Sequence, residues 1–152
     1  MWIDVLRDSA SVAMYSVIGL LLMMAGFFIV DLLTPGNLKK LLWEERSKNA
    51  ALFVGSKALG VSIIVCAAIY ASAHDLFAGL VSTLVYGVMG IIVMAVSFLL
   101  IDLFTPGKLG DLVHDPELHP ATWVSAASHL GVALIISVAL LLLLSGRSLP
   151  NP

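Results

Sequence analysis

The sequence predicts an all-α, polytopic membrane protein, with four transmembrane helices from a tandem two-helix repeat in parallel orientation. Hydrophobic residues make up 60% of the 152 residues and charged residues only 12%, and the mean hydropathy is +1.04. A soluble globule needs more polar surface than this. The apolar residues gather in four runs, each near the roughly 20 residues that cross a bilayer. Two of these runs end in the same motif, Asp-Leu-x-Thr-Pro-Gly, at residues 31–36 and 102–107.

The four runs and the motif divide the chain into two repeats. We place the membrane spans at about residues 11–30, 50–73, 78–101 and 122–144. The predicted organisation is an N-terminal segment (1–10), repeat 1 (11–73), repeat 2 (78–144) and a polar tail (145–152). The first run is expected to be a retained helix, because a secretory signal begins with a positive patch, whereas here Arg7 lies between Asp4 and Asp8.

The first helix of each repeat carries matching residues at every fourth position. Shifting the chain by 71 positions, the offset between Asp31 and Asp102, aligns the repeats without a gap. The matches are Ser11, Tyr15, Gly19, Met23, Phe27 and Asp31 with Ser82, Tyr86, Gly90, Met94, Phe98 and Asp102. Such a row is a packing ridge, with Gly19 and Gly90 allowing close approach. The row drifts about 40° per step, so it cannot all face one neighbour. Two crossings separate equivalent points, which predicts a pseudo-twofold axis along the membrane normal.

The repeated motif itself predicts the start of a short interfacial helix. Thr34 suits the N-cap and Pro35 the first helical position. The leucines at 38, 41 and 42 would then dip toward the membrane between charged residues. The second copy begins in the same way, until Pro116 and Pro120 interrupt it. The motif residues are Thr34, Pro35, Gly36, Thr105, Pro106 and Gly107.

The second helix of each repeat contains a small-xxx-small element. It runs from Ser56 to Gly60 in repeat 1 and from Ala127 to Gly131 in repeat 2. Such positions let membrane helices pack closely, so Gly60 and Gly131 are predicted packing positions. The pattern does not distinguish contacts within one chain from contacts between chains, and we expect a homo-oligomer.

Four ionisable groups lie toward the motif end of the spans. Asp31 and Asp102 end the first and third helices, while Lys57 and His129 lie about two turns, roughly 10 Å, into the second and fourth. In the structural interpretation, Lys57 snorkels to the headgroups or pairs with Asp31. His129 is then hydrogen-bonded by Ser125. The functional interpretation makes the four groups part of a proton or ion path, because an intramembrane charge is costly.

Enzyme chemistry finds little support in the sequence. The loop residues His114, Asp115, Glu117 and His119 match no metal-ligand spacing and are interpreted as solvated charges. The sequence has no Gly-x-Ser-x-Gly elbow and no phosphate-binding glycine loop. We therefore expect no catalytic residues, no metal, no cofactor and no nucleic-acid partner. The single cysteine, Cys66, excludes an intrachain disulfide.

Loop charges predict the orientation in the membrane. The loops that carry the motif hold five cations, Lys39, Lys40, Arg46, Lys48 and Lys108, whereas the opposite side holds only Arg7 and Arg147. The positive-inside rule then places both motif loops in the cytoplasm and both termini outside. Because the third loop also carries Asp111, Asp115 and Glu117, cytoplasmic termini are the alternative.

The doubled motif, the aligned Leu-Gly-Val of residues 59–61 and 130–132, and the small size resemble the YjfL-type family of bacterial inner-membrane proteins, the domain-of-unknown-function family three-fifty. The resemblance covers about residues 11–143. It implies four transmembrane helices from a two-helix duplication in the bacterial plasma membrane. It brings no established activity to carry over.

Two hypotheses of function remain open at the level of sequence. The first is an oligomeric membrane scaffold or envelope-associated interaction protein, whose cytoplasmic Thr-Pro-Gly loops dock a soluble protein partner. The second is a small ion, proton or polyamine channel or transporter that uses Asp31, Asp102, Lys57 and His129 and is formed by two or more chains.

Overall fold

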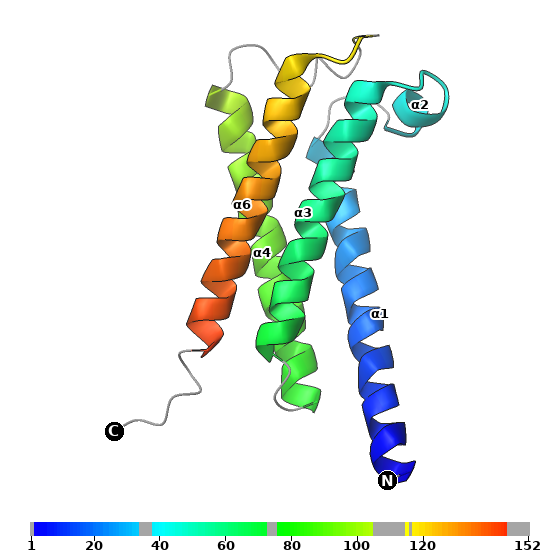
Figure 1. The fold of residues 1–152 in the computed structure, drawn as a ribbon, viewed down its shortest axis with the longest axis vertical. Coiled ribbons are helices and arrows are strands. Elements are labelled where there is room, and N and C mark those ends of the chain that lie inside the picture. The colour runs from blue at the N-terminus through cyan, green and yellow to red at the C-terminus, as the bar shows by residue number, and fades with distance from the viewer. Residues whose placement is uncertain (1, 34–37, 73–75, 105–114, 116, 146–152) are drawn as a thin grey trace.

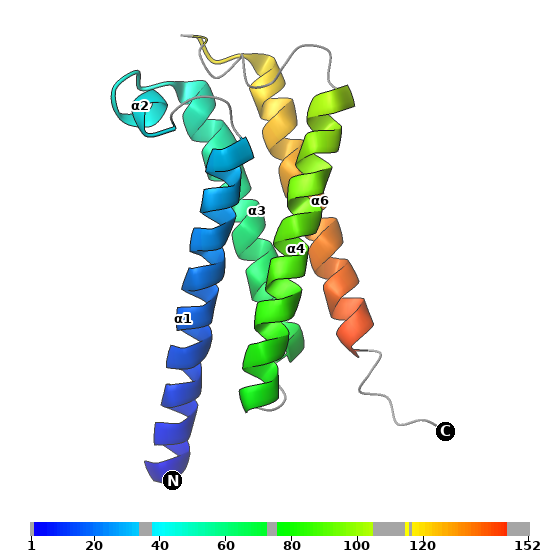
Figure 2. The same cartoon turned by 180° about the vertical axis from the view of Figure 1, so that it is seen from behind.

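The computed structural model describes residues 2–33, 38–72, 76–104, 115 and 117–145. Four long helices lie side by side in this part of the chain (Figure 1). They are α1 (Trp2–Leu33), α3 (Lys48–Ser72), α4 (Leu76–Phe104) and α6 (Pro120–Ser145), and a short helix, α2 (Leu38–Trp43), precedes α3. α1 and α4 run in one direction and α3 and α6 in the other, as the parallel repeat predicts (Figures 1 and 2).

Each long helix contains a segment that is long and apolar enough to cross a membrane. These segments have 24 to 28 residues and mean hydropathies of 2.1 to 2.6. The predicted all-α, four-helix membrane fold is therefore confirmed. The helix bounds differ most at the N-terminus, where α1 begins at Trp2 and includes the residues expected to form a separate segment. Residues 2–10 contain no Pro or Gly, and the Ser9 hydroxyl donates to the Val5 carbonyl within the helix (2.7 Å).

α3 lies at the centre of the bundle and contacts each of the other long helices. Within an apolar stretch of 18 residues in its membrane-spanning segment 56% of the residues are buried, compared with 11% in the corresponding stretch of α1. The main core cluster contains Leu22, Val61, Ile64, Val65, Ile91, Met94, Ala133, Ile136 and Leu140. Since all four long helices contribute to this cluster, the two repeats form one packed body.

The four-residue ridge has different surroundings in the two repeats. In α4 its members Gly90, Met94 and Phe98 are all buried. In α1 only Gly19 of the ridge is buried, while Phe27 is 44% exposed and Asp31 is exposed as well. The cause is position, because α4 contacts α1, α3 and α6, whereas α1 lies at the edge of the bundle (Figure 2). The ridge is therefore a packing seam along α4 and only in part along α1.

Close helix approach explains two of the four glycines predicted to pack. A Cβ added to Gly60 would lie 2.6 Å from Met94 Cε, and one added to Gly90 would overlap Ile64 Cγ2. At Gly19 an added Cβ would make only ordinary contacts of 3.6 Å. The expectation for Gly131 is wrong within this chain, because an added Cβ would meet nothing within 4 Å.

Three further close approaches involve glycines that the repeat comparison does not single out. At Gly79 an added Cβ would overlap Tyr15 Oη and the Ser72 carbonyl oxygen. An added Cβ would lie 2.7 Å from Val61 Cγ1 at Gly26 and 2.5 Å from Leu22 Cδ1 at Gly87. Both glycines are buried. The sites of closest packing are therefore set by how the helices cross and not by the repeat alone.

The short helix predicted after the first motif is present as α2. Leu41 on α2 is 2% exposed and packs against Ala50 of α3. The chain then turns at Arg46, whose φ of 51° lies in the left-handed region. Ser47 caps α3 by accepting a hydrogen bond from the Ala50 amide (3.1 Å). The predicted motif caps, Thr34 to Gly36 and Thr105 to Gly107, lie outside the described residues, as does the expected second copy of the helix.

We expect Gly90→Ala to lower the free energy of unfolding by about 1 to 3 kcal/mol, because its methyl group overpacks the contact between α3 and α4. Gly131→Ala is the matched control. It adds the same methyl group into open space and should be neutral or stabilising by up to about 1 kcal/mol through helix propensity. Thermal unfolding of both variants in the same detergent measures the difference. Equal stabilities would contradict the close approach at Gly90.

Candidate functional site

Two of the four predicted ionisable residues lie buried together inside the bundle. Lys57 of α3 and His129 of α6 are each 2% exposed. The Lys57 Nζ lies 3.4 Å from the ring centroid of Phe98 and 3.8 Å from that of Phe53. An ammonium group over an aromatic face is stabilised by the ring quadrupole. The expected snorkelling of Lys57 to the headgroups is therefore wrong, because its charged end points inward between aromatic rings.

The aromatic rings around Lys57 also contact one another. Phe53 and Phe98 meet edge to face, with centroids 5.7 Å apart and an interplanar angle of 74°. The His129 ring lies 5.7 Å from the Phe53 centroid and 5.1 Å from that of Phe98. We call Lys57, Phe53, Phe98 and His129 the Lys57 cluster. Phe53 and Lys57 share one face of α3 because they are four residues apart, and α4 and α6 supply one residue each.

His129 is satisfied at one nitrogen by the preceding turn of its own helix. Its Nδ1 lies 2.6 Å from the Ser125 carbonyl oxygen and 3.4 Å from the Ser125 hydroxyl. A carbonyl only accepts, so Nδ1 carries the proton and donates, which leaves Nε2 as an acceptor in the neutral ring. Nε2 is buried and has no hydrogen-bond partner among the described residues. The predicted Ser125 contact is therefore present, and it fixes the tautomer.

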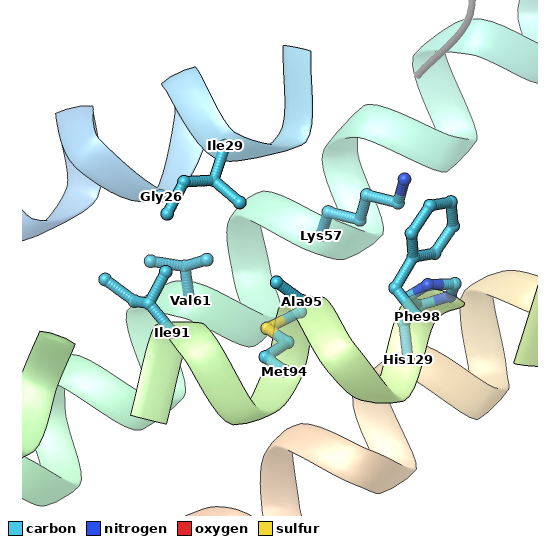
Figure 3. A pocket seen from close by; sticks show the side chains of 9 residues that line it. All are labelled: Gly26, Ile29, Lys57, Val61, Ile91, Met94, Ala95, Phe98 and His129. Carbon is cyan, nitrogen blue, oxygen red and sulfur yellow. The ribbon is translucent and has the colours of Figure 1, made fainter. Parts of the chain in front are cut away.

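A small cavity borders the Lys57 cluster (Figure 3). Besides Lys57, Phe98 and His129, its wall contains Gly26, Ile29, Val61, Ile91, Met94 and Ala95. The space open to the centre of a water molecule is about 20 Å³, which is room for about one water. Most of the wall is apolar, so the cavity is a gap in the packing and not a passage through the described part of the bundle.

The two aspartates of the motif differ from this buried pair. Asp31 is exposed, near the end of α1. Asp102 lies in the last turns of α4, and its side chain falls outside the described part of the structure. The described residues therefore bring Lys57 and His129 together but leave Asp31 on the outside.

Asn49 forms a polar junction between the repeats that the sequence analysis missed. It is 1% exposed. Its Nδ2 donates to the carbonyls of Asp115 (3.1 Å) and Glu117 (2.6 Å), and its Oδ1 accepts from the His119 amide (3.0 Å) and the Thr122 hydroxyl (2.8 Å). These bonds use the full capacity of an amide side chain. Asn49 thus ties the start of α3 to the segment that leads into α6.

The described part of the acidic loop before α6 forms hydrogen bonds with its own backbone. The Asp115 carboxylate accepts a hydrogen bond from the Glu117 amide, and His119 Nδ1 accepts one from the Ala121 amide, each at 3.1 Å. Among the described residues no group of three or more His, Cys, Asp or Glu side chains is placed to hold a metal ion. His114 lies outside the described residues.

We expect Asn49→Ala to lower the free energy of unfolding by about 1 to 3 kcal/mol, because it leaves buried hydrogen-bonding groups unpaired. Hydrogen exchange at the His119 amide should also become faster. Thermal unfolding and exchange mass spectrometry measure the two effects. Ser128→Ala is the control, since that hydroxyl donates only to the Val124 carbonyl of its own helix (2.9 Å). Unchanged exchange at His119 in Asn49→Ala would contradict the junction.

Comparison with known proteins agrees with this fold. The family model described as "Domain of Unknown Function (DUF350)" matches residues 2–140. A "UPF0719 transmembrane protein" of Mycolicibacterium paratuberculosis is 34% identical over 135 residues, which is 89% of each chain. UPF0719 transmembrane proteins of Mycobacterium bovis and Mycobacterium tuberculosis are 34% identical over 136 residues, or 90% of each chain. No solved structure matches. The chain is therefore a multi-pass membrane protein that belongs to the uncharacterised DUF350 family.

Proposed function

We propose that the protein is an oligomeric membrane scaffold or interaction protein, in which copies of the chain assemble through an open groove between α3 and α6. The groove is the observation that carries the proposal. Its wall contains Ala51, Leu52, Gly55, Ser56, Leu59, Trp123, Ala126, Ala127 and Leu130. It lies on the outside of the two helices, where no other described part of the chain covers Gly55.

Small residues make this face hollow. Gly55 is exposed, and an added Cβ there would meet nothing within 4 Å. The same is true of an added Cβ at Gly131, one turn beyond Ala127 on α6. In lipid, helices associate through close packing at small residues, because burial of apolar surface no longer drives association. Leu59 and Trp123, each 58% exposed, give the groove a bulky apolar margin for a partner helix to contact.

The small size of the interior cavity also favours assembly over conduction by one chain. The cavity beside the Lys57 cluster has room for about one water molecule, and its wall is mostly apolar. A transport route needs a continuous polar lining, which the described helices of one chain do not enclose. We therefore infer that the chain acts through contacts on its outer surface.

Location and orientation complete the proposal. The exposed cations Lys39, Lys40, Arg46 and Lys48 lie at the α2 end of the bundle, whereas Arg7 lies near the start of α1 at the other end. The bacterial relatives favour a location in the bacterial plasma membrane. The positive-inside rule then favours an orientation with the motif loops in the cytoplasm and the termini outside. A soluble protein partner would bind the loops at the cytoplasmic end, and the proposal includes no catalytic activity.

We expect Gly55→Leu to weaken self-association by at least about tenfold, because the leucine side chain fills the groove that the partner chain would occupy. Self-association is measured by dilution in detergent or by single-molecule photobleaching in lipid. The monomer should keep its stability, since the substitution meets open space in this structure.

Ala25→Leu is the matched control, because Ala25 is also small and exposed but lies on α1. It should leave the oligomer unchanged. A wild-type protein that stays monomeric at high density in lipid would overturn the assembly proposal. Equal weakening by Gly55→Leu and Ala25→Leu would overturn the assignment to the groove.

The buried Lys57 and His129 favour a second candidate function, movement of protons or of cations such as polyamines. An intramembrane lysine beside an imidazole is unusual, because the charge of the lysine costs about 2.5 to 3.5 kcal/mol to insert. This candidate requires the bundle to open, since Lys57 and His129 are buried within one chain while Asp31 is exposed.

Flux measurements separate the two candidates. We expect the wild-type protein in sealed liposomes to leave an imposed proton, cation or polyamine gradient intact, because the cavity beside the Lys57 cluster has room for only about one water molecule. A lipid-only vesicle and a vesicle with His129→Phe, which keeps a ring in the same packing position, are the controls. Dissipation by the wild type that disappears in His129→Phe would establish the second candidate and contradict the first.

A further inference from the structure

We propose that the corner formed by α2 and the start of α3 binds the phosphate groups of anionic phospholipids. Lys39, Arg46 and Lys48 supply the positive charge, and the indole ring of Trp43 supplies an apolar contact with the lipid. The proposal is independent of the groove between α3 and α6, because one copy of the chain carries the complete corner.

The position of α2 places this corner at the level of the headgroups. The membrane-spanning segment of α3 begins at Lys48, and α2 ends five residues earlier, at Trp43. α2 stands beside the end of α3 and not inside the bundle (Figures 1 and 2). Leu41 fixes it there by packing on Ala50, which is fully buried. A short helix held at this depth lies along the boundary between headgroups and acyl chains.

The outer side of the corner combines apolar and cationic groups. Trp43 is 73% exposed, and together with Leu42 and Arg46 it lines an open hollow. Tryptophan is enriched at membrane interfaces because its ring is apolar and its N–H is polar. A guanidinium group binds phosphate oxygens through paired hydrogen bonds. The hollow therefore offers a lipid both a contact for its chain and a donor for its phosphate.

Charge favours an anionic lipid over a zwitterionic one. Residues 38–49 contain four cations and two carboxylates. The ion pair between Lys40 and Glu45, with 3.4 Å between Nζ and Oε1, contains one cation and one carboxylate and so adds no net charge. The segment keeps a net positive charge, carried by exposed side chains. Such a charge attracts anionic lipids, and the attraction falls off over about one Debye length. At this depth lipid surrounds every copy of the protein, which is why we commit to lipid as the occupant.

The test compares lipids around the full-length protein in nanodiscs of phosphatidylcholine. Spin-labelled phosphatidylglycerol and spin-labelled phosphatidylcholine are added separately, and the fraction of each that is immobilised by the protein is measured. The wild type should prefer phosphatidylglycerol, and salt should weaken the preference. Lys39→Gln and Arg46→Gly should each lower it by up to about fivefold. Arg46→Gly suits the fold, because glycine adopts a φ of 51° without strain.

Arg7→Gln is the matched control. It removes one exposed cation from the opposite end of α1 and should leave the preference nearly unchanged. Arg46→Lys, which keeps the charge, should retain most of the preference for phosphatidylglycerol. The proposal is overturned if the wild type shows no preference, if Arg46→Gly matches the wild type, or if Arg7→Gln lowers the preference equally. It is also overturned if the corner variants lose a co-purifying protein while the lipid preference stays the same.

Discussion

The burial of the Lys57 ammonium group is the constraint on which the arrangement of the helices depends. A charge inside the bilayer costs about 2.5 to 3.5 kcal/mol on insertion scales, so protein must surround it. Here Phe53 and Phe98 present their rings at 3.8 and 3.4 Å from Nζ, and His129 packs against both rings. Three helices contribute to the Lys57 cluster, and α3, which carries the lysine, is the most buried of the long helices.

The cluster also shows why two similar repeats pack differently. At an offset of 71 residues, Lys57 corresponds to Ser128 and His129 to Ala58, while Phe98 corresponds to Phe27. Phe27 is 44% exposed, whereas Phe98, its counterpart in the other repeat, is 6% exposed. Ser128, which stands where a second lysine would be, is only partly buried. The chain therefore holds the buried charge once, on the side of the bundle that α4 and α6 enclose.

Sequence reasoning succeeded where local rules decide the structure. Length and hydropathy identified four spans, and the spacing of four residues identified the bond between Ser125 and His129. Sequence reasoning failed where the structure depends on which face of a helix meets a neighbouring helix. Snorkelling, one of the interpretations of Lys57, is contradicted by its burial. Gly131 makes no close contact within this chain, and the junction at Asn49 was missed. Each outcome depends on which neighbouring helix a given face meets, and periodicity and spacing along one helix do not show this. The start of α1 was missed because Asp4, Arg7 and Asp8 lower the hydropathy without breaking the helix.

The central helix α3 connects the interior of the protein to the surfaces proposed for function. The Lys57 cluster joins α3 to α4 and α6 within the membrane, and Asn49 joins the start of α3 to the segment before α6. The groove between α3 and α6 is therefore a preformed hollow, which lowers the ordering cost of binding a partner helix. Leu41 fixes α2 to the same helix. Any movement of α3 that opened the Lys57 cluster would thus shift the groove and the α2 corner together. The buried charge and the two outer surfaces are therefore coupled through α3.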